Sequence, residues 1–115
     1  MKIEIKILVG DSCVTSEDGQ HVYDEIYPKL AASESVCLNF SGVRVFASPF
    51  FNFAIGQLLK DLEPENLNQL LQVENITSDG MLVWKRVVKN AKEYYKNPER
   101  RKAIDEILKQ QAEDE

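Results

Sequence analysis

The sequence contains one histidine, His21, and two cysteines, Cys13 and Cys37. These are the residue types that most often bind zinc or act as a base or a nucleophile. Zinc accepts all three as ligands, but a structural zinc site takes four protein ligands and a catalytic site takes three and a water. His21 falls on the early, exposed part of a helical pattern, where a solvated histidine is expected. With no secretion signal, both cysteines are expected to be reduced thiols. The sequence therefore predicts no metal, no disulfide and no cofactor.

Carboxylates are abundant and occur in pairs, which general acid–base catalysis could use. The pairs are Glu17 with Asp18, Asp24 with Glu25, and Glu63 with Glu65. Their positions favour helix caps, a helix surface and a loop. None lies beside a second polar group in a predicted apolar cleft, which acid–base catalysis would require. The five glycines are scattered singly, so the sequence has no phosphate-binding loop and no nucleophile elbow. We therefore expect that the protein is not an enzyme.

The first half of the chain alternates between strand and helix patterns. Alternating apolar residues predict a strand over 3–9, which Gly10 ends. Thr15 has capping spacing for a helix that continues to Leu30, and Pro28 within it predicts a kink or a break. A second strand is predicted over 35–41, with Val36, Leu38 and Phe40 on one face and Cys37, Asn39 and Ser41 on the other.

The second half is expected to be mainly helical. Residues 50–62 form a helix candidate, with Ser48 as its N-cap and Pro49 as its first residue. A connector at 63–66 precedes a third strand over 70–74, and a long helix follows over 79–96. Asn97 and Pro98 predict the start of a last helix, whose buried residues would be Ala103, Ile104, Ile107 and Leu108 and which ends in a frayed tail over 110–115.

The order β-α-β-α-β-α-α is typical of one α/β domain in which helices connect the strands. Each predicted strand has one apolar face, so we expect a small mixed or parallel sheet with helices packed mainly on one side. The other side must then be polar or covered by a partner. The domain itself is expected to span 1–97, with 98–115 adding a C-terminal helix and a polar tail.

Charge is distributed unevenly along the 115 residues, whose formal net charge is −5. The segment 85–102 holds eight basic and two acidic residues, whereas residues 1–80 hold five basic and twelve acidic ones. General nucleic-acid binders are usually basic over the whole domain, so nucleic acid is an unlikely partner here. No apolar run approaches the ~18 residues of a membrane span, and the charged N-terminus does not resemble a signal peptide. A cytoplasmic protein without membrane association is expected.

Residues 36–59 contain a strand, Gly-Val, a hydrophobic pair and a serine at a helix start. The matching residues are Asn39, Gly42, Val43, Ser48, Phe50, Ala54, Gly56 and Leu58. This pattern resembles the STAS domain of anti-sigma factor antagonists and sulfate transporters, and more closely the STAS-like domain of unknown function of small bacterial proteins. The resemblance implies a mixed β/α domain without catalytic residues that binds a kinase-like protein partner.

Ser48 falls on the serine that is phosphorylated in the antagonist family, where the phosphate blocks partner binding. The resemblance thus makes Ser48 a candidate phosphorylation switch, although Ala47 and Pro49 stand where the family has an acidic and a small residue. The other interpretation is structural. A serine hydroxyl at an N-cap accepts a backbone hydrogen bond, and its loss to alanine costs ~1 kcal/mol.

Two sets of side chains are candidates for partner binding. On a helical wheel Phe53 lies opposite the buried face and Phe50 lies on its flank, so either the C-terminal helices cover these rings or a partner does. Lys85, Lys89 and Lys92 lie outside the apolar stripe of their helix. They form either a solvated face or a docking strip for an acidic surface, including that of a second copy in a homodimer.

These observations predict a non-enzymatic regulatory protein-binding module of the STAS type. Its partner would be an ATPase-like, kinase-like or signalling protein, with Ser48 as the candidate switch. The alternative is a nucleic-acid-associated accessory protein that uses the basic 85–102 helix, which a steep loss of DNA affinity with salt would identify.

Overall fold

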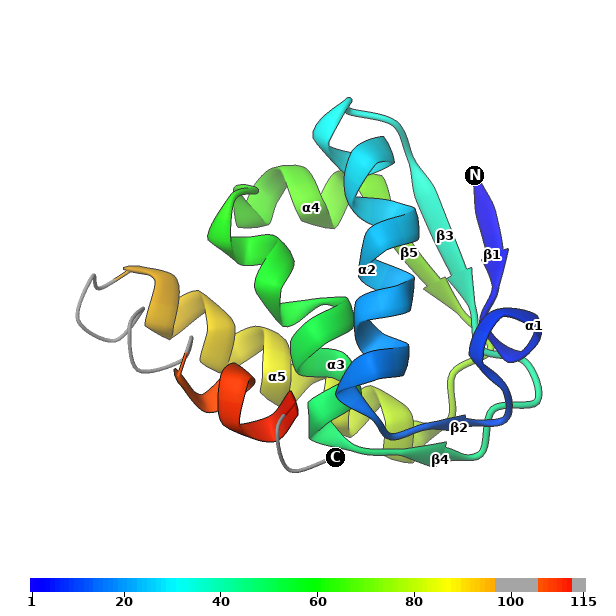
Figure 1. Cartoon of the computed structure of the whole chain (residues 1–115). Coiled ribbons are helices and arrows are strands. Elements are labelled where there is room, and N and C mark those ends of the chain that lie inside the picture. Colours follow the sequence, from blue (N-terminus) through cyan, green and yellow to red (C-terminus); the bar gives the residue numbers. More distant parts are fainter. Residues whose placement is uncertain (97–105, 113–115) are drawn as a thin grey trace.

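Three parallel strands form the main sheet of the computed structural model, which describes residues 1–96 and 106–112 (Figure 1). The strands are β1 (Lys2–Glu4), β3 (Val36–Asn39) and β5 (Leu71–Glu74), and β3 lies between the other two. The register places Ile3 beside Leu38 and Leu38 beside Val73. A second, two-stranded parallel sheet pairs β2 (Ser12–Cys13) with β4 (Val45–Phe46). The expected small sheet is therefore present, and it is parallel.

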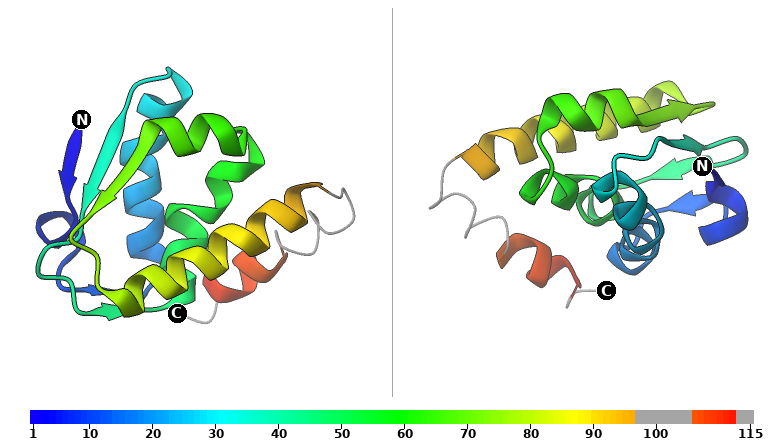
Figure 2. Two further views of the ribbon diagram at one scale, coloured as in Figure 1. Left: turned by 180° about the vertical axis from the view of Figure 1, so that it is seen from behind. Right: turned by 90° about the horizontal axis from the view of Figure 1, so that it is seen from above.

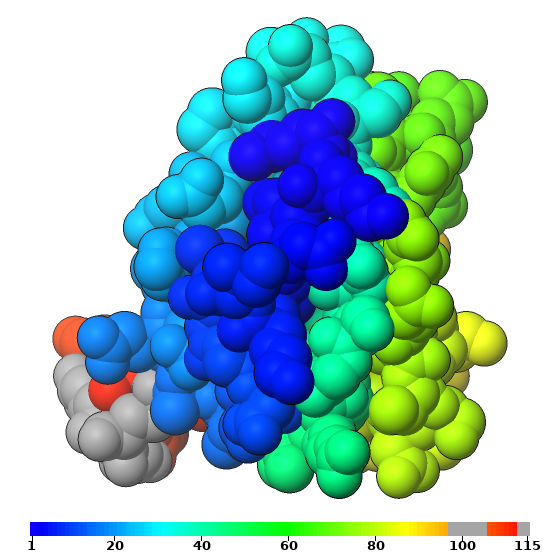
Figure 3. Space-filling view, turned by 90° about the vertical axis from the view of Figure 1, so that its right-hand side faces the viewer, coloured from blue at the N-terminus to red at the C-terminus, as the bar shows by residue number. Residues whose placement is uncertain are grey.

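The longer helices lie on one side of the main sheet (Figure 2). They include α2 (Ser16–Ala31), α3 (Ser48–Ala54) and α5 (Ser78–Lys96). The core between them and the sheet contains buried aliphatic and aromatic side chains, among them Ile3, Val22, Ile26, Val36, Leu38, Phe40, Phe51, Leu58 and Val87. Figure 3 looks onto the opposite side, where side chains of β1, β3 and β5 reach the surface. The predicted one-sided α/β arrangement is confirmed for the described residues.

The predicted strand over 3–9 is wrong beyond Glu4, because the chain turns into a short helix, α1 (Ile5–Val9). Ile5 is buried and Leu8 and Val9 pack against the core, which is the spacing of a helix face. Ile7 is 85% exposed. The alternating pattern misled because four of these five residues are apolar and fit both periods.

Helix α2 begins as predicted, since the Asp18 N–H donates to the Thr15 hydroxyl at 3.1 Å. Pro28 does not break it, and the helix continues for three residues to Ala31. Proline removes a hydrogen bond to the carbonyl of residue 24. Asp24 and Pro28 both lie on the exposed face of α2, where water can satisfy that carbonyl. The cost of the proline is thus lower than in a buried helix.

The single helix predicted over 50–62 is two separate segments, and a third helical segment follows it. Helix α3 starts two residues earlier and ends at Ala54, a 3-10 helix, η1 (Gly56–Lys60), follows, and α4 (Pro64–Leu70) replaces the predicted connector. Gly56 lies at the interruption and favours it, because glycine is a poor helix former, and α5 packs so closely that a Cβ atom there would lie 3.3 Å from the Val87 side chain. The chain bends at this close contact. Pro64, at the first position of α4, was the signal for the extra helix.

The third strand and the long helix are confirmed as β5 and α5. The predicted start of the last helix, and Ala103 and Ile104 in it, lie outside the described residues, as does the predicted domain boundary at 97. Residues 106–112 are helical, so the helix includes the first part of the predicted tail, and 113–115 lie outside the described residues. Leu108 is buried there as predicted, whereas Ile107 is exposed. Among the described helices, none is long and apolar enough to cross a membrane.

Candidate partner-binding surface

Ser48 lies at the start of α3, but it is not the N-cap. Ala47 takes that position, with the extended backbone that an N-cap requires (φ −144°, ψ 154°), and Ser48 and Pro49 are the first two helical residues. The Ala47 N–H donates to the Cys13 carbonyl at 2.9 Å, so the pairing of β2 with β4 fixes where the helix begins. The predicted cap role of Ser48 is wrong. Its side chain is half-buried.

The aromatic residues around α3 form a packed cluster rather than an exposed patch. Phe51 lies at its centre, with ring centroids 5.2 Å from Phe50, 5.9 Å from Phe46 and 5.7 Å from Trp84. Phe50 is 1% exposed. The expectation that Phe50 lies on a flank is therefore wrong, because the chain around it packs the ring into the core, out of reach of a partner in this structure.

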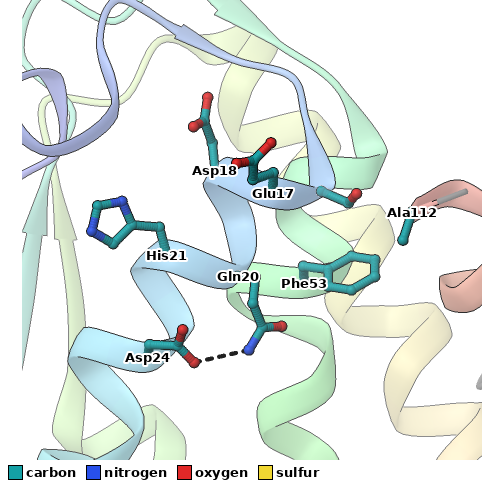
Figure 4. A pocket seen from close by; sticks show the side chains of 8 residues that line it. Glu17, Asp18, Gln20, His21, Asp24, Phe53 and Ala112 are labelled. Atoms are coloured by element: carbon teal, nitrogen blue, oxygen red, sulfur yellow. Dashed lines mark hydrogen bonds between the residues drawn. The ribbon is translucent and has the colours of Figure 1, made fainter. Parts of the chain in front are cut away.

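Phe53 is half-exposed and lies on the side of α3 that faces the helical segment 106–112. Asn52 beside it donates a 2.9 Å hydrogen bond from Nδ2 to Oε1 of Gln111. Phe53 and Ala112 line the same hollow of about 640 Å³ (Figure 4). The C-terminal segment thus covers part of this side of α3, as one of the two interpretations of Phe53 requires.

The rest of that hollow comes from the first turns of α2, where acidic side chains predominate. It is lined by Ser16, Glu17, Asp18, Gln20, His21 and Asp24. His21 is exposed, as predicted, and Gln20 donates to the Asp24 carboxylate at 2.9 Å. Figure 4 shows the His21 ring directed away from Phe53. Within the described residues no three His, Cys, Asp or Glu side chains come together as metal ligands.

Lys85, Lys89 and Lys92 lie together on the outer side of α5. They line an open groove of about 400 Å³ with Trp84, Val88 and Glu93. Lys85 and Lys89 are exposed, and Lys92 is half-buried. Trp84 also packs edge-on against Phe51 and Phe40 in the core. The groove therefore combines three cationic groups with the apolar surface of a ring that packs against the core.

The open face of the main sheet carries two polar clusters, which no single sequence motif indicates. The Asn39 amide donates to both oxygens of Glu4, at 3.1 and 2.9 Å, and its carbonyl oxygen accepts from Asn75 at 2.9 Å. Lys2 lies 3.2 Å from Glu74, whose same oxygen accepts from the Cys37 thiol at 3.0 Å. The alternation of apolar and polar residues in the three strands predicted that this face is polar or covered by a partner, and polar side chains line it.

These contacts shift the titration of the groups involved. The hydrogen bond from Cys37 and the ion pair with Lys2 lower the pKa of Glu74 below its ordinary value, while the same pair raises the pKa of Lys2. Partial burial and the bond to Glu74 raise the pKa of Cys37. Both cysteines are free thiols. Cys13 lies in β2, and its complete burial raises its pKa to about 12.

A family model described as the STAS-like domain of unknown function matches residues 18–81 of the chain. This match includes α2, β3, β4, α3, η1, α4 and β5, which form most of the sheet and of the helical layer. The chain therefore belongs to the family of STAS-like domains. No curated protein and no solved structure matches it.

Proposed function

We propose that this STAS-like domain is a non-enzymatic regulatory module that binds an ATPase-like or kinase-like signalling protein in the bacterial cytoplasm. The observation that carries the proposal is the groove on α5. Three lysines surround the exposed parts of Trp84 and Val88. Tryptophan is enriched at protein interfaces, and the lysines supply a charge that an acidic partner surface complements. The groove fits an acidic, amphipathic segment of the partner.

Ser48 is the candidate regulatory residue. Because Ala47 and not Ser48 holds the N-cap position of α3, a phosphate on the half-buried Ser48 removes no helix cap. A phosphoserine adds a charge of about −1.5 to −2 at neutral pH. The lysines of α5 attract an acidic partner, and the negative charge of a phosphate on Ser48 would repel the same acidic partner. Binding is then switched without refolding of the domain.

The experiment is affinity capture from cells that express the tagged domain, comparing a charge-reversed α5 with a matched control. Lys85, Lys89 and Lys92 are replaced by Glu in one variant, and Lys6, Lys29 and Lys60 in the other, so that both carry the same net charge. We expect the α5 variant alone to lose an ATPase-like or kinase-like partner. Both variants should have the far-ultraviolet circular dichroism spectrum of the wild type, since five of the six side chains are exposed and Lys92 is only half-buried.

Two outcomes contradict the proposal. If both variants retain or lose the partner equally, the effect is one of net charge and α5 is not the interface. If the domain binds duplex DNA with an affinity that falls steeply between low and moderate salt, and Lys85, Lys89 and Lys92 are required for it, the lysines contact phosphates and the nucleic-acid alternative holds.

A further inference from the structure

The outer edge of β1 is open. β3 pairs with one side of β1, and no strand of the described chain pairs with the other. A groove of about 430 Å³ lies along that edge, lined by Lys2, Ile3, Glu4, Ile7, Leu8 and Glu25. Its most exposed apolar side chain, Ile7, is 85% accessible. The edge thus has room for another strand and apolar surface for that strand to cover.

The direction of the backbone groups in β1 follows from its pairing with β3. The Met1 carbonyl accepts the Cys37 N–H at 2.8 Å, so the backbone groups of Met1 and Ile3 are directed at β3. Because these directions alternate along a strand, the N–H and C=O of Lys2 and the N–H of Glu4 point to the free edge. Glu4 is the N-cap of α1, so its carbonyl oxygen belongs to the first turn of that helix and is not available at the edge. The free edge therefore offers two donors and one acceptor.

We propose that β1 pairs antiparallel with β1 of a second copy of this chain, about a twofold axis at Ile3. This register puts Lys2 opposite Glu4 of the second copy, and Glu4 opposite its Lys2. Each Glu4 N–H then meets the Lys2 carbonyl of the other copy, which gives two symmetric backbone hydrogen bonds. Lys2 and Glu4 alternate with the buried Ile3 and lie on the open polar face, so their side chains form two cross-strand ion pairs.

Charge selects this register over its neighbours. A twofold axis at Lys2 would place the two lysines directly opposite each other, and an axis at Glu4 would do the same with the two carboxylates. Like charges in opposite positions destabilise a strand pair. Closed twofold dimers need a surface that complements itself, and Lys-Ile-Glu has this property in the antiparallel direction only.

The test is sedimentation equilibrium of the wild type, of Lys2→Glu, of Glu4→Lys and of an equimolar mixture of the two variants. We expect the wild type to form a dimer, and each variant alone to dimerise about tenfold more weakly, because both symmetric pairs become repulsive. In the mixture, the carboxylates of the Lys2→Glu chain face the ammonium groups of the Glu4→Lys chain. We therefore expect a heterodimer at least as stable as the wild-type dimer.

The mixture separates an interface from a folding defect, which matters because Lys2 also contacts Glu74 and Glu4 contacts Asn39 within one chain. A variant that is merely misfolded cannot be restored by mixing. A wild type that remains monomeric at concentrations near ~1 mM overturns the proposal, as does a pair of variants that dimerise like the wild type or a mixture without heterodimer.

Discussion

The start of α3 gives the sharpest test of the local structure, because two adjacent residues compete for the capping role. Ala47 has the N-cap backbone and no side-chain oxygen, and Pro49 at the second helical position has no N–H. The Phe50 N–H is then the first-turn donor within reach of a side-chain oxygen at position 47. Ala47→Asn should therefore supply a missing cap and raise the free energy of unfolding by about 1 kcal/mol, while Ser48→Ala should change it by less than ~0.5 kcal/mol.

A gain of 1 kcal/mol corresponds to an increase in Tm of about 4 °C for a domain of this size. Urea unfolding at neutral pH measures the change in the free energy of unfolding. The signal is the fluorescence of the single tryptophan, Trp84, whose ring centroid lies 5.7 Å from that of Phe51 in α3. Ala47→Asp is a second variant, whose charge adds a favourable interaction with the helix dipole. If Ser48→Ala loses about 1 kcal/mol and Ala47→Asn gains nothing, the helix begins one residue later and the reasoning is refuted.

Three further predictions concern the core, the thiols and the polar sheet face. Gly19→Ala should lower the free energy of unfolding by about 1–3 kcal/mol despite the better helix propensity of alanine, because its Cβ would collide with the Phe50 carbonyl oxygen; an unchanged urea midpoint would contradict this packing of α2 on α3. In the folded protein at pH 8, Cys37 should react with a thiol reagent much faster than Cys13, whose pKa is about 12, and equal rates in the native state would show that β2 opens readily. Because the pKa of Glu74 is lowered, its carboxylate stabilises the fold above its ordinary pKa of 4.5, and this contribution is lost as the pH falls through the folded-state pKa. Glu74→Gln should therefore lose less stability on acidification than the wild type. An identical dependence of stability on pH in the two proteins would exclude this contribution.

Much of the fold could be predicted because the strand faces are strictly patterned. Leu38 and Val73 point to the helices, while Asn39 and Glu74 point outward, and that alternation is sufficient to predict a sheet with one polar face. The N-cap of α2 at Thr15 could be predicted for a similar reason. It depends only on the Thr15 hydroxyl and on the N–H of Asp18, three residues later.

The errors arose where a distant contact overrides the local pattern. The helix over 50–62 was interrupted by Gly56, whose approach to Val87 depends on α5, some thirty residues later. The cap of α3 moved to Ala47 because its N–H is bound by Cys13 in β2. Phe50 is buried because the segments around it fold over it, which a regular helical wheel cannot represent.

The candidate site was predictable in composition and not in geometry. The lysines of α5 lie outside its apolar stripe, as their spacing indicated, but the groove that they form with Trp84 requires the ring to be held by Phe40 and Phe51. The cover of Phe53 by the segment 106–112 depends on a contact across 59 positions, between Asn52 and Gln111. No local pattern predicts such a contact.

The most direct test of the central claim, that α5 binds a regulatory protein partner, is photo-crosslinking in living cells from a crosslinking amino acid placed at Lys89. A matched probe at Asn68, an exposed position of α4, serves as the control. We expect a covalent adduct with an ATPase-like or kinase-like protein from position 89 and not from position 68, and we expect this adduct to be lost when Ser48→Asp is introduced. Adducts that are absent at position 89, equal at both positions, or formed with nucleic acid would contradict it.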